Sequence, residues 1–242
     1  MENSIVRTLE YYLVSHPKIL NFTWNPPHTP LSSLRFLSLS IASYLSLTLL
    51  LLLPLPPLPP RILKPFTAFH NLTLSILSLT MTIGTSLTIL THTPNLRSTI
   101  CFPPNTPPTG PLFFWAYIFY HHSTVPIMCY LWLNSSQSLF PIALLTNSSV
   151  HVIMYSYYFL TAVGIRPPWK RAVTDCQIVQ FVFSFAVSGV MLYYHFYGGG
   201  CSGMKAWCFN AVFNASLLAL FLNFHIKSYA NSKKNRNTDK DS

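Results

Sequence analysis

The chain has 242 residues, of which 50% are hydrophobic, 15% are aromatic and only 8% are charged. A water-exposed surface usually needs about a quarter of charged residues, so this composition excludes an ordinary soluble protein. The net charge of +10 could indicate a nucleic-acid partner, but the basic residues form neither one patch nor one helix face, and we expect no such partner. The sequence therefore predicts an all-α protein that crosses a membrane several times.

Six apolar runs follow one another along the chain, each close to the roughly 20 residues that cross a hydrocarbon core as a helix. They cover about residues 32–53, 66–91, 112–133, 140–163, 176–196 and 206–226. The residues before the first run contain Glu2 and Glu10 and show no cleavage pattern, so we expect this run to serve as the membrane signal. We find no internal repeat. We expect one transmembrane domain, residues 1–230, followed by a disordered basic tail, residues 231–242.

Basic residues gather at the ends of the apolar runs, where the positive-inside bias places them in the cytosol. The groups after the first, fourth and sixth runs are Arg61 and Lys64; Arg166, Lys170 and Arg171; and Lys227, Lys233, Lys234 and Arg236. Three runs separate the first two groups, and this odd number would place them on opposite sides. We therefore expect residues 112–133, which contain two histidines and Pro126, to enter and leave on one side as a re-entrant segment.

Polar side chains inside the last three runs follow helical spacing. Such residues usually face the interior of a bundle. The fourth run has Asn147, His151, Tyr155 and Tyr158; the fifth has Gln177, Gln180, Ser184, Ser188 and His195; the sixth has Asn210 and Asn214. At about 100° per residue each set forms one stripe. Three stripes predict one polar interior; the alternative is that they only join the helices by hydrogen bonds.

His121 and His122 lie within the apolar sequence FFWAYIFYHHSTVPIMCYLWL, residues 113–133. A di-iron site needs several ligands for each iron, and this chain offers few histidines inside its spans and only Asp175 as a nearby acid, so we expect no metal and no cofactor. A hydrolase triad lacks a carboxylate to orient a histidine. The remaining chemistry is an imidazole that acts as base, acid or acyl carrier beside neutral donors.

Three segments together resemble the ELO family of fatty acid elongases, and its plant members in particular: YHHSTV (120–125), NSSVHVIMYSYYFL (147–160) and WKRAVTDCQIVQF (169–181). The resemblance implies a seven-span protein of the endoplasmic reticulum membrane, with a lumenal N-terminus and six spans around a narrow acyl tunnel. It implies condensation of a long-chain acyl-CoA with malonyl-CoA to a 3-ketoacyl-CoA, with release of CO2 and CoA. The reductases and the dehydratase of the elongation cycle are the partners it implies.

The same resemblance assigns residue roles. His121 matches the acyl-accepting histidine of the family's His-x-x-His-His box, and His122 matches its last histidine. His151 matches a partner histidine in the next span, where Asn147 helps to polarise malonyl-CoA beside Tyr155. The matched substrate contacts are Tyr158, Lys170, Arg171, Gln177 and Gln180. The two basic residues among them suit the phosphates of CoA, or they only enforce topology.

The chain departs from the family around this box. Ile118 stands where the first histidine should be, and the residues from Gly110 to His121 include no Lys, Glu or Asp, although the family has a Lys-x-x-Glu-x-x-Asp-Thr block here. We expect a deletion of roughly 25 residues, about one span with its loop. Two states stay open: an active condensing enzyme that uses His121 and His151, or a catalytically silent, truncated or mis-spliced member with a structural or partner-binding role. A transporter is disfavoured because we see no repeated halves.

The family topology also predicts a disulfide. It places Cys101 and Cys201 in loops that face the oxidising lumen, where disulfides persist. Cys208 is the rival partner, and five free thiols are the alternative. We expect Cys129 and Cys176, which lie in spans, to stay reduced.

Overall fold

The computed structural model describes residues 4–53, 59–93, 95–122 and 126–230. Within these ranges the regular structure is helical, apart from a single antiparallel bridge between Thr23 and Thr109. Five long helices form the body of the protein: α3 (Leu34–Leu51), α4 (Pro60–His92), α8 (Phe140–Ala162), α9 (Lys170–Tyr197) and α10 (Met204–His225). The predicted disordered tail and most of the proline run at 54–60 fall outside the described residues.

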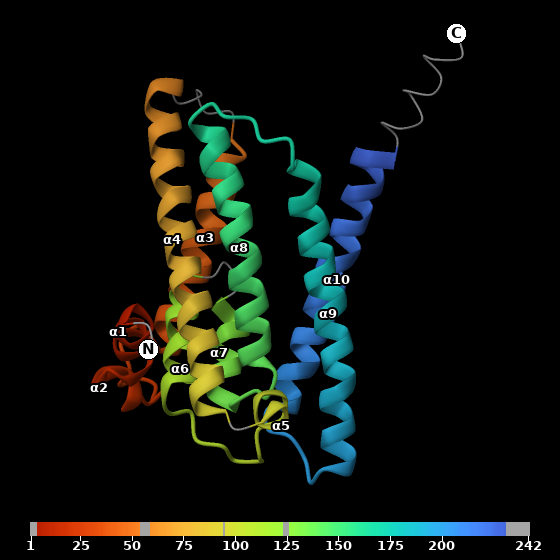
Figure 1. Ribbon diagram of the computed structural model, residues 1–242. Coiled ribbons are helices and arrows are strands. Elements are labelled where there is room, and N and C mark those ends of the chain that lie inside the picture. The colour runs from red at the N-terminus through yellow and green to blue at the C-terminus, as the bar shows by residue number, and fades with distance from the viewer. Residues whose placement is uncertain (1–3, 54–58, 94, 123–125, 231–242) are drawn as a thin grey trace.

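Shorter elements surround one end of these long helices (Figure 1). They are α1 (Ser4–Glu10), a π-helix (Tyr11–Ser15), α2 (Pro17–Leu20), α5 (Leu96–Ile100), α6 (Pro111–His122) and α7 (Pro126–Ser135), and a second π-helix (Ile226–Ala230) continues α10. Local sequence explains several starts. The Ser33 hydroxyl accepts from the Phe36 amide at 3.1 Å and caps α3, and Asn95 and Ser98 form a capping box at α5.

Four segments are long and apolar enough to cross a membrane: Leu34–Leu51, Pro60–His92, Lys170–Tyr197 and Met204–Ser228. The chain is therefore a polytopic helical membrane protein. The fourth predicted run forms α8, which has 23 residues, but its polar face lowers its mean hydropathy. Length and composition thus support four of the six predicted spans directly.

The third predicted run, residues 112–133, is not one continuous span. It forms two helices, α6 and α7, on either side of residues 123–125. The two helices pack against each other and lie beside the lower halves of α4 and α8 (Figure 1). Pro126 starts α7 because proline fits the first turn of a helix, whereas inside one it removes a hydrogen bond. The expectation of a non-continuous segment is confirmed, and the hairpin returns the chain to the end at which it entered.

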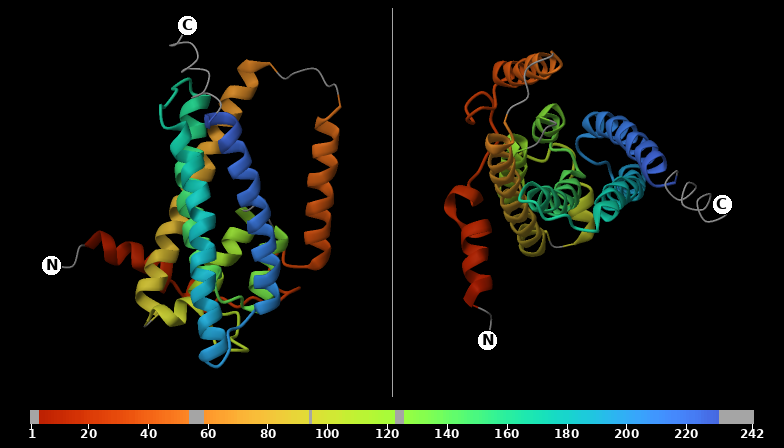
Figure 2. Two further views of the ribbon diagram at one scale, coloured as in Figure 1. Left: turned by 90° about the vertical axis from the view of Figure 1, so that its right-hand side faces the viewer. Right: turned by 90° about the horizontal axis from the view of Figure 1, so that it is seen from above.

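This path removes the conflict in the charge pattern. The start of α4, the loop between α8 and α9, and the end of α10 all lie at the upper end of the bundle (Figure 1; Figure 2, left). Arg61, Arg166, Lys170 and Lys227 therefore share one end. The opposite end has the disulfide between Cys101 and Cys201, so the predicted pairing is confirmed.

The most extensive helix interface joins α4 to α8. The buried residues of α4 are mostly small or hydroxylated: Asn71, Ser75, Ser78, Met81, Gly84, Thr85 and Thr88. The hydroxyls of Ser75 and Ser156 lie 2.9 Å apart, and Thr82 donates to the Ser148 hydroxyl at 3.0 Å. Small side chains let two helix backbones approach closely in a membrane, where hydrogen bonds across the interface add to packing.

Aromatic residues fix the α6–α7 hairpin. Phe119 of α6 stacks on Trp132 of α7 with ring centroids 6.0 Å apart, and Trp132 lies 6.5 Å from Phe140 at the start of α8. The indole of Trp24 donates to the Asn134 side chain at 2.7 Å. The hairpin is thus held between the N-terminal segment and α8, with its tip towards α3 and α10.

Candidate functional site

A central cavity of about 410 Å³ lies among α7, α8, α9 and α10 and reaches Tyr44 of α3. Its polar lining consists of Asn147, His151, Tyr155, Gln177, Gln180, Ser184, Asn210 and Asn214. The prediction that three polar stripes meet in one interior is confirmed for these residues. Amides, a phenol and one imidazole can together donate to and accept from the oxygen atoms of a ligand.

The lower ends of the stripes do not reach this cavity, and here the prediction is wrong. Ser188 donates to the Ser184 carbonyl at 2.8 Å and accepts from the Trp207 indole at 3.1 Å. His195 accepts from the Cys201 amide at 2.9 Å. Helices α9 and α10 approach each other at this end, so these polar groups join the helices and the disulfide loop.

His151 stands among neutral groups. Its ring centroid lies 5.3 Å from that of Tyr155 and 6.5 Å from that of Phe119. The described residues that line the central cavity include no Asp, Glu, Lys or Arg. Across the described ranges, no three His, Cys, Asp or Glu side chains come together where they could hold a metal ion. The chemistry available in the cavity is therefore hydrogen bonding and proton transfer by an imidazole.

His121 lies in a different place. It is exposed, and it lines a second cavity of about 430 Å³ between α3, the hairpin tip and α10. Its ring contacts those of Tyr117 and Tyr120, each with centroids 4.7 Å apart. The side chain of His122 lies outside what the structure describes.

The second cavity adjoins the central one, because Tyr44, Met128 and Phe213 line both. His121 lines only the second cavity and His151 lines only the central one. The structure therefore does not bring His121 and His151 into one cavity, although the resemblance implies that they work together.

A third cavity of about 540 Å³ continues towards the end that has the basic residues. It is lined by Tyr158 and Lys170, and it shares Met154, Gln177, Leu217 and Phe221 with the central cavity. The amide of Gln177 lies 3.3 Å from the Met154 sulfur, at this shared wall. The three cavities thus follow one another from His121 to Lys170.

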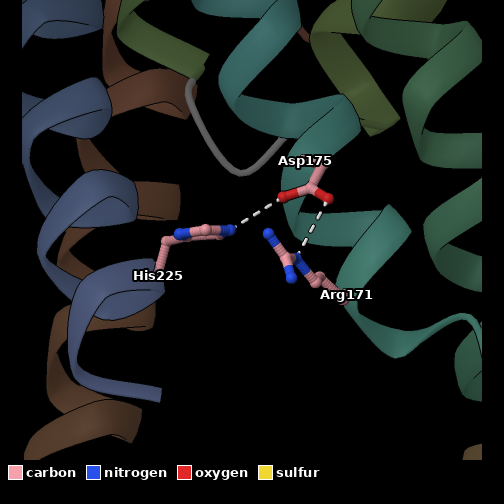
Figure 3. Close-up of polar contacts among 3 residues, drawn as sticks. All are labelled: Arg171, Asp175 and His225. Carbon is pink, nitrogen blue, oxygen red and sulfur yellow. Dashed lines mark ion pairs between the residues drawn. The ribbon is translucent and has the colours of Figure 1, made fainter. Parts of the chain in front are cut away.

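Arg171 is directed elsewhere. Its guanidinium Nε lies 3.6 Å from one carboxylate oxygen of Asp175, and the His225 imidazole lies 2.9 Å from the other (Figure 3). Asp175 is the one acidic residue of α9, and its carboxylate links α9 to α10 near their upper ends. Of the two basic residues expected to contact a ligand's phosphates, Lys170 lines the third cavity, and Arg171 lines none of the three cavities described above.

Two buried polar atoms complete the central cavity. Asn210 is 4% exposed and Trp132 is 2% exposed, and both line it. Asn210 Oδ1 and Trp132 Nε1 have no hydrogen-bond partner among the described residues. The stripe pattern identified Asn210, but sequence reasoning missed Trp132, because an indole in an aromatic-rich run gives no polar signal.

These features define a membrane-embedded helical protein with a polar, largely uncharged interior that opens towards a basic end. The sequence profile described as ELO: GNS1/SUR4 family matches residues 29–120 and 119–237. The chain therefore belongs to the ELO family of fatty acid elongases.

Relatives that have names are consistent with this family. The chain is 29% identical to "Fatty acid elongase 3-like" of Arabidopsis thaliana, over 98% of this chain and 97% of the plant protein. It is 29% identical to "Fatty acid elongase A" of Dictyostelium discoideum, over 86% of this chain and 88% of that protein. It is 34% identical to mouse "Very long chain fatty acid elongase 5", over 50% of this chain and 40% of that protein. No solved structure matches.

The comparisons also bear on the expected deletion. The family match breaks into two parts that meet at residues 119 and 120, directly before His121. The plant alignment covers 282 positions, although this chain has 242 residues. Some of the relative's residues therefore lie opposite gaps in this chain, as a missing segment at the box requires.

Proposed function

We propose that the chain binds a long-chain acyl-CoA and malonyl-CoA in its row of cavities, at the endoplasmic reticulum membrane, and that it condenses them only weakly. One observation carries the proposal. The central cavity gathers Asn147, His151 and Tyr155, whereas His121 lines a separate cavity. The chain thus keeps the binding interior of an elongase but divides its histidines.

The complete reaction has two steps. In the first, the His121 imidazole attacks the thioester carbonyl of the acyl-CoA, the carbon–sulfur bond breaks, and CoA leaves as a thiol. In the second, malonyl-CoA loses CO2, and the resulting enolate attacks the acyl carbonyl. The bond between this carbonyl and the His121 nitrogen breaks, which gives a 3-ketoacyl-CoA two carbons longer, and the imidazole leaves with a proton taken up from water. The neutral donors around His151 and Asn147 suit this enolate, because fixed dipoles in a dry cavity stabilise developing charge better than water does.

The direction of substrate entry follows from the charges. The third cavity leads to Lys170, at the end that has the basic residues. An ammonium group there can pair with the phosphates of CoA, and the positive-inside bias makes this end cytosolic. We expect the reductases and the dehydratase of the elongation cycle to meet the product at the same end.

We expect the condensation of acyl-CoA with malonyl-CoA to be weak because of where the two histidines lie. Reacting groups must approach to about 3–3.5 Å, and a misplacement of about 1 Å can cost a hundredfold in rate. His121 and His151 line two different cavities, which share only Tyr44, Met128 and Phe213 in their linings. A catalytically silent member with a structural or partner-binding role is the second candidate, and the split family match favours it.

A pair of assays on the purified chain in nanodiscs separates the candidates. Equilibrium binding of radiolabelled malonyl-CoA should be measurable and should weaken about tenfold in Asn147→Leu, while Asn223→Leu, exposed on α10, should leave it unchanged. Release of labelled CO2 in the presence of palmitoyl-CoA should stay close to background. Absence of any thioester binding would favour the silent member, and rapid CO2 release would refute weak condensation.

A further inference from the structure

Two polar side chains in the lining of the central cavity have chemistry that the assigned residues do not use. Trp132 comes from α7 and Asn210 from α10, two helices in contact with each other. Both side chains are more than nine-tenths buried, and both line the cavity. A buried polar atom that lacks a partner costs free energy, so such atoms in a folded protein need an explanation.

Packing explains the aromatic ring of Trp132, but it does not explain the N–H group of the indole. The ring stacks against Phe119 and Phe140, with centroids 6.0 and 6.5 Å away. Another aromatic side chain would fill the same space without burying a donor. Asn210 likewise buries an amide in the cavity lining, where leucine has a similar volume.

The two atoms are complementary to one particular group. An indole N–H can only donate, and an amide oxygen can only accept. A ligand that satisfies both must offer an acceptor and, nearby, a donor. The reacting end of an acyl-CoA does so, because its thioester carbonyl accepts and the first amide N–H of its pantetheine arm lies two carbons beyond the sulfur.

Resting on the proposed function, we infer that Trp132 and Asn210 are substrate-positioning residues for the thioester end of acyl-CoA. The Trp132 N–H donates to the thioester carbonyl, and Asn210 Oδ1 accepts from the neighbouring pantetheine amide. They hold the thioester in the cavity that Asn147 and His151 of α8 also line. The free energy lost by leaving both atoms unpaired in the empty protein is recovered when the thioester binds.

Two probes separate the two hydrogen bonds. S-palmitoyl-N-acetylcysteamine has the thioester and the amide, whereas S-ethyl thiopalmitate has the thioester alone. Binding of each, tritiated, to the full chain in nanodiscs should weaken about tenfold in Trp132→Phe, since both probes present the carbonyl. Asn210→Leu should weaken only the amide-bearing probe about tenfold.

A stability measurement adds a readout that a purely structural role would not give. Without ligand, Asn210→Leu should raise the melting temperature, because it removes an unpaired buried acceptor. Asn223→Leu on the same helix, where the side chain is exposed, should leave the binding of both probes unchanged.

The outcomes are distinct. Equal weakening of both probes in Asn210→Leu, no weakening of either, or a lower melting temperature without ligand would overturn the inference and leave the proposed function standing. Failure of the unmodified chain to bind either probe would remove both the inference and the proposed function.

Discussion

Gly84 of α4 has no side chain, and this allows Trp115 of α6 to pack closely against α4. A methyl group at this position would overlap the buried indole of Trp115, whose N–H donates to the Leu13 carbonyl at 3.1 Å. Gly84→Ala should therefore destabilise the protein by about 1–3 kcal/mol, the usual cost of overpacking. Thermal unfolding of the two proteins in detergent measures this loss of stability.

The matched control is Gly189→Ala in α9, where an added methyl group meets open space. It should be neutral or stabilise by up to about 1 kcal/mol, because alanine favours a helix over glycine. Equal melting temperatures for the two variants would contradict the close packing of α6 on α4.

Ile118 occupies the position of the missing first histidine of the box. Its side chain is partly buried against the aromatic cluster around Phe119 and Trp132. Ile118→His should not raise CO2 release from malonyl-CoA, because His121 would still line its separate cavity. It should also lower stability by about 1–3 kcal/mol, since an imidazole loses its hydration among apolar groups. Ile118→Leu is the control, and any gain of activity in Ile118→His alone would contradict this account.

At the scale of elements, the disulfide ties α5 to the loop between α9 and α10. It joins cysteines 100 residues apart, and cross-links that close long loops restrict the unfolded chain most. The double variant Cys101→Ser/Cys201→Ser should lose roughly 2–5 kcal/mol of stability. Cys208→Ser, at an exposed free thiol, should change little. Peptide mapping that finds Cys101 alkylated without prior reduction would refute the pairing.

The hairpin of α6 and α7 sets the topology. The Gly110 amide donates to the Phe22 carbonyl at 2.8 Å, and the Trp24 amide donates to the Pro108 carbonyl at 2.9 Å, so the N-terminal segment lies at the end that has the disulfide. The segment Asn21-Phe-Thr23 is an N-glycosylation sequon, and it should therefore be glycosylated while a tag after residue 242 stays cytosolic. A lumenal tag together with glycosylated Asn21 would contradict the hairpin path.

For the whole molecule, the pattern of apolar runs and basic residues in the sequence predicted much of the fold. Apolar length identified the long helices. The odd number of runs between Arg61 and Arg166 showed that one of them could not cross once, and two histidines and Pro126 singled out the third. The α4–α8 interface was missed because Ser75, Thr82 and Ser148 are too weakly polar to mark a face by composition, although Ser75 and Thr82 are seven residues, or two helical turns, apart on one face of α4.

The candidate site was also predicted only in part from the sequence. Helical spacing places Asn147, His151 and Gln177 on interior faces whatever the details of packing. The position of His121 depends instead on where the hairpin turns, which is a tertiary property that no local pattern contains. His195 was misplaced because a stripe does not reveal where two helices close on each other.

The central claim is that the chain keeps an elongase interior but lacks the segment that would bring its histidines together. The direct test is condensation of palmitoyl-CoA with labelled malonyl-CoA by two purified proteins: the 242-residue chain, and the same chain with a family-like span ending in His-x-x inserted between Tyr120 and His121. We predict little product from the first and clear elongation by the second, which His121→Ala or His151→Ala then abolishes while Tyr158→Phe costs less. Robust elongation by the unmodified chain would contradict the account.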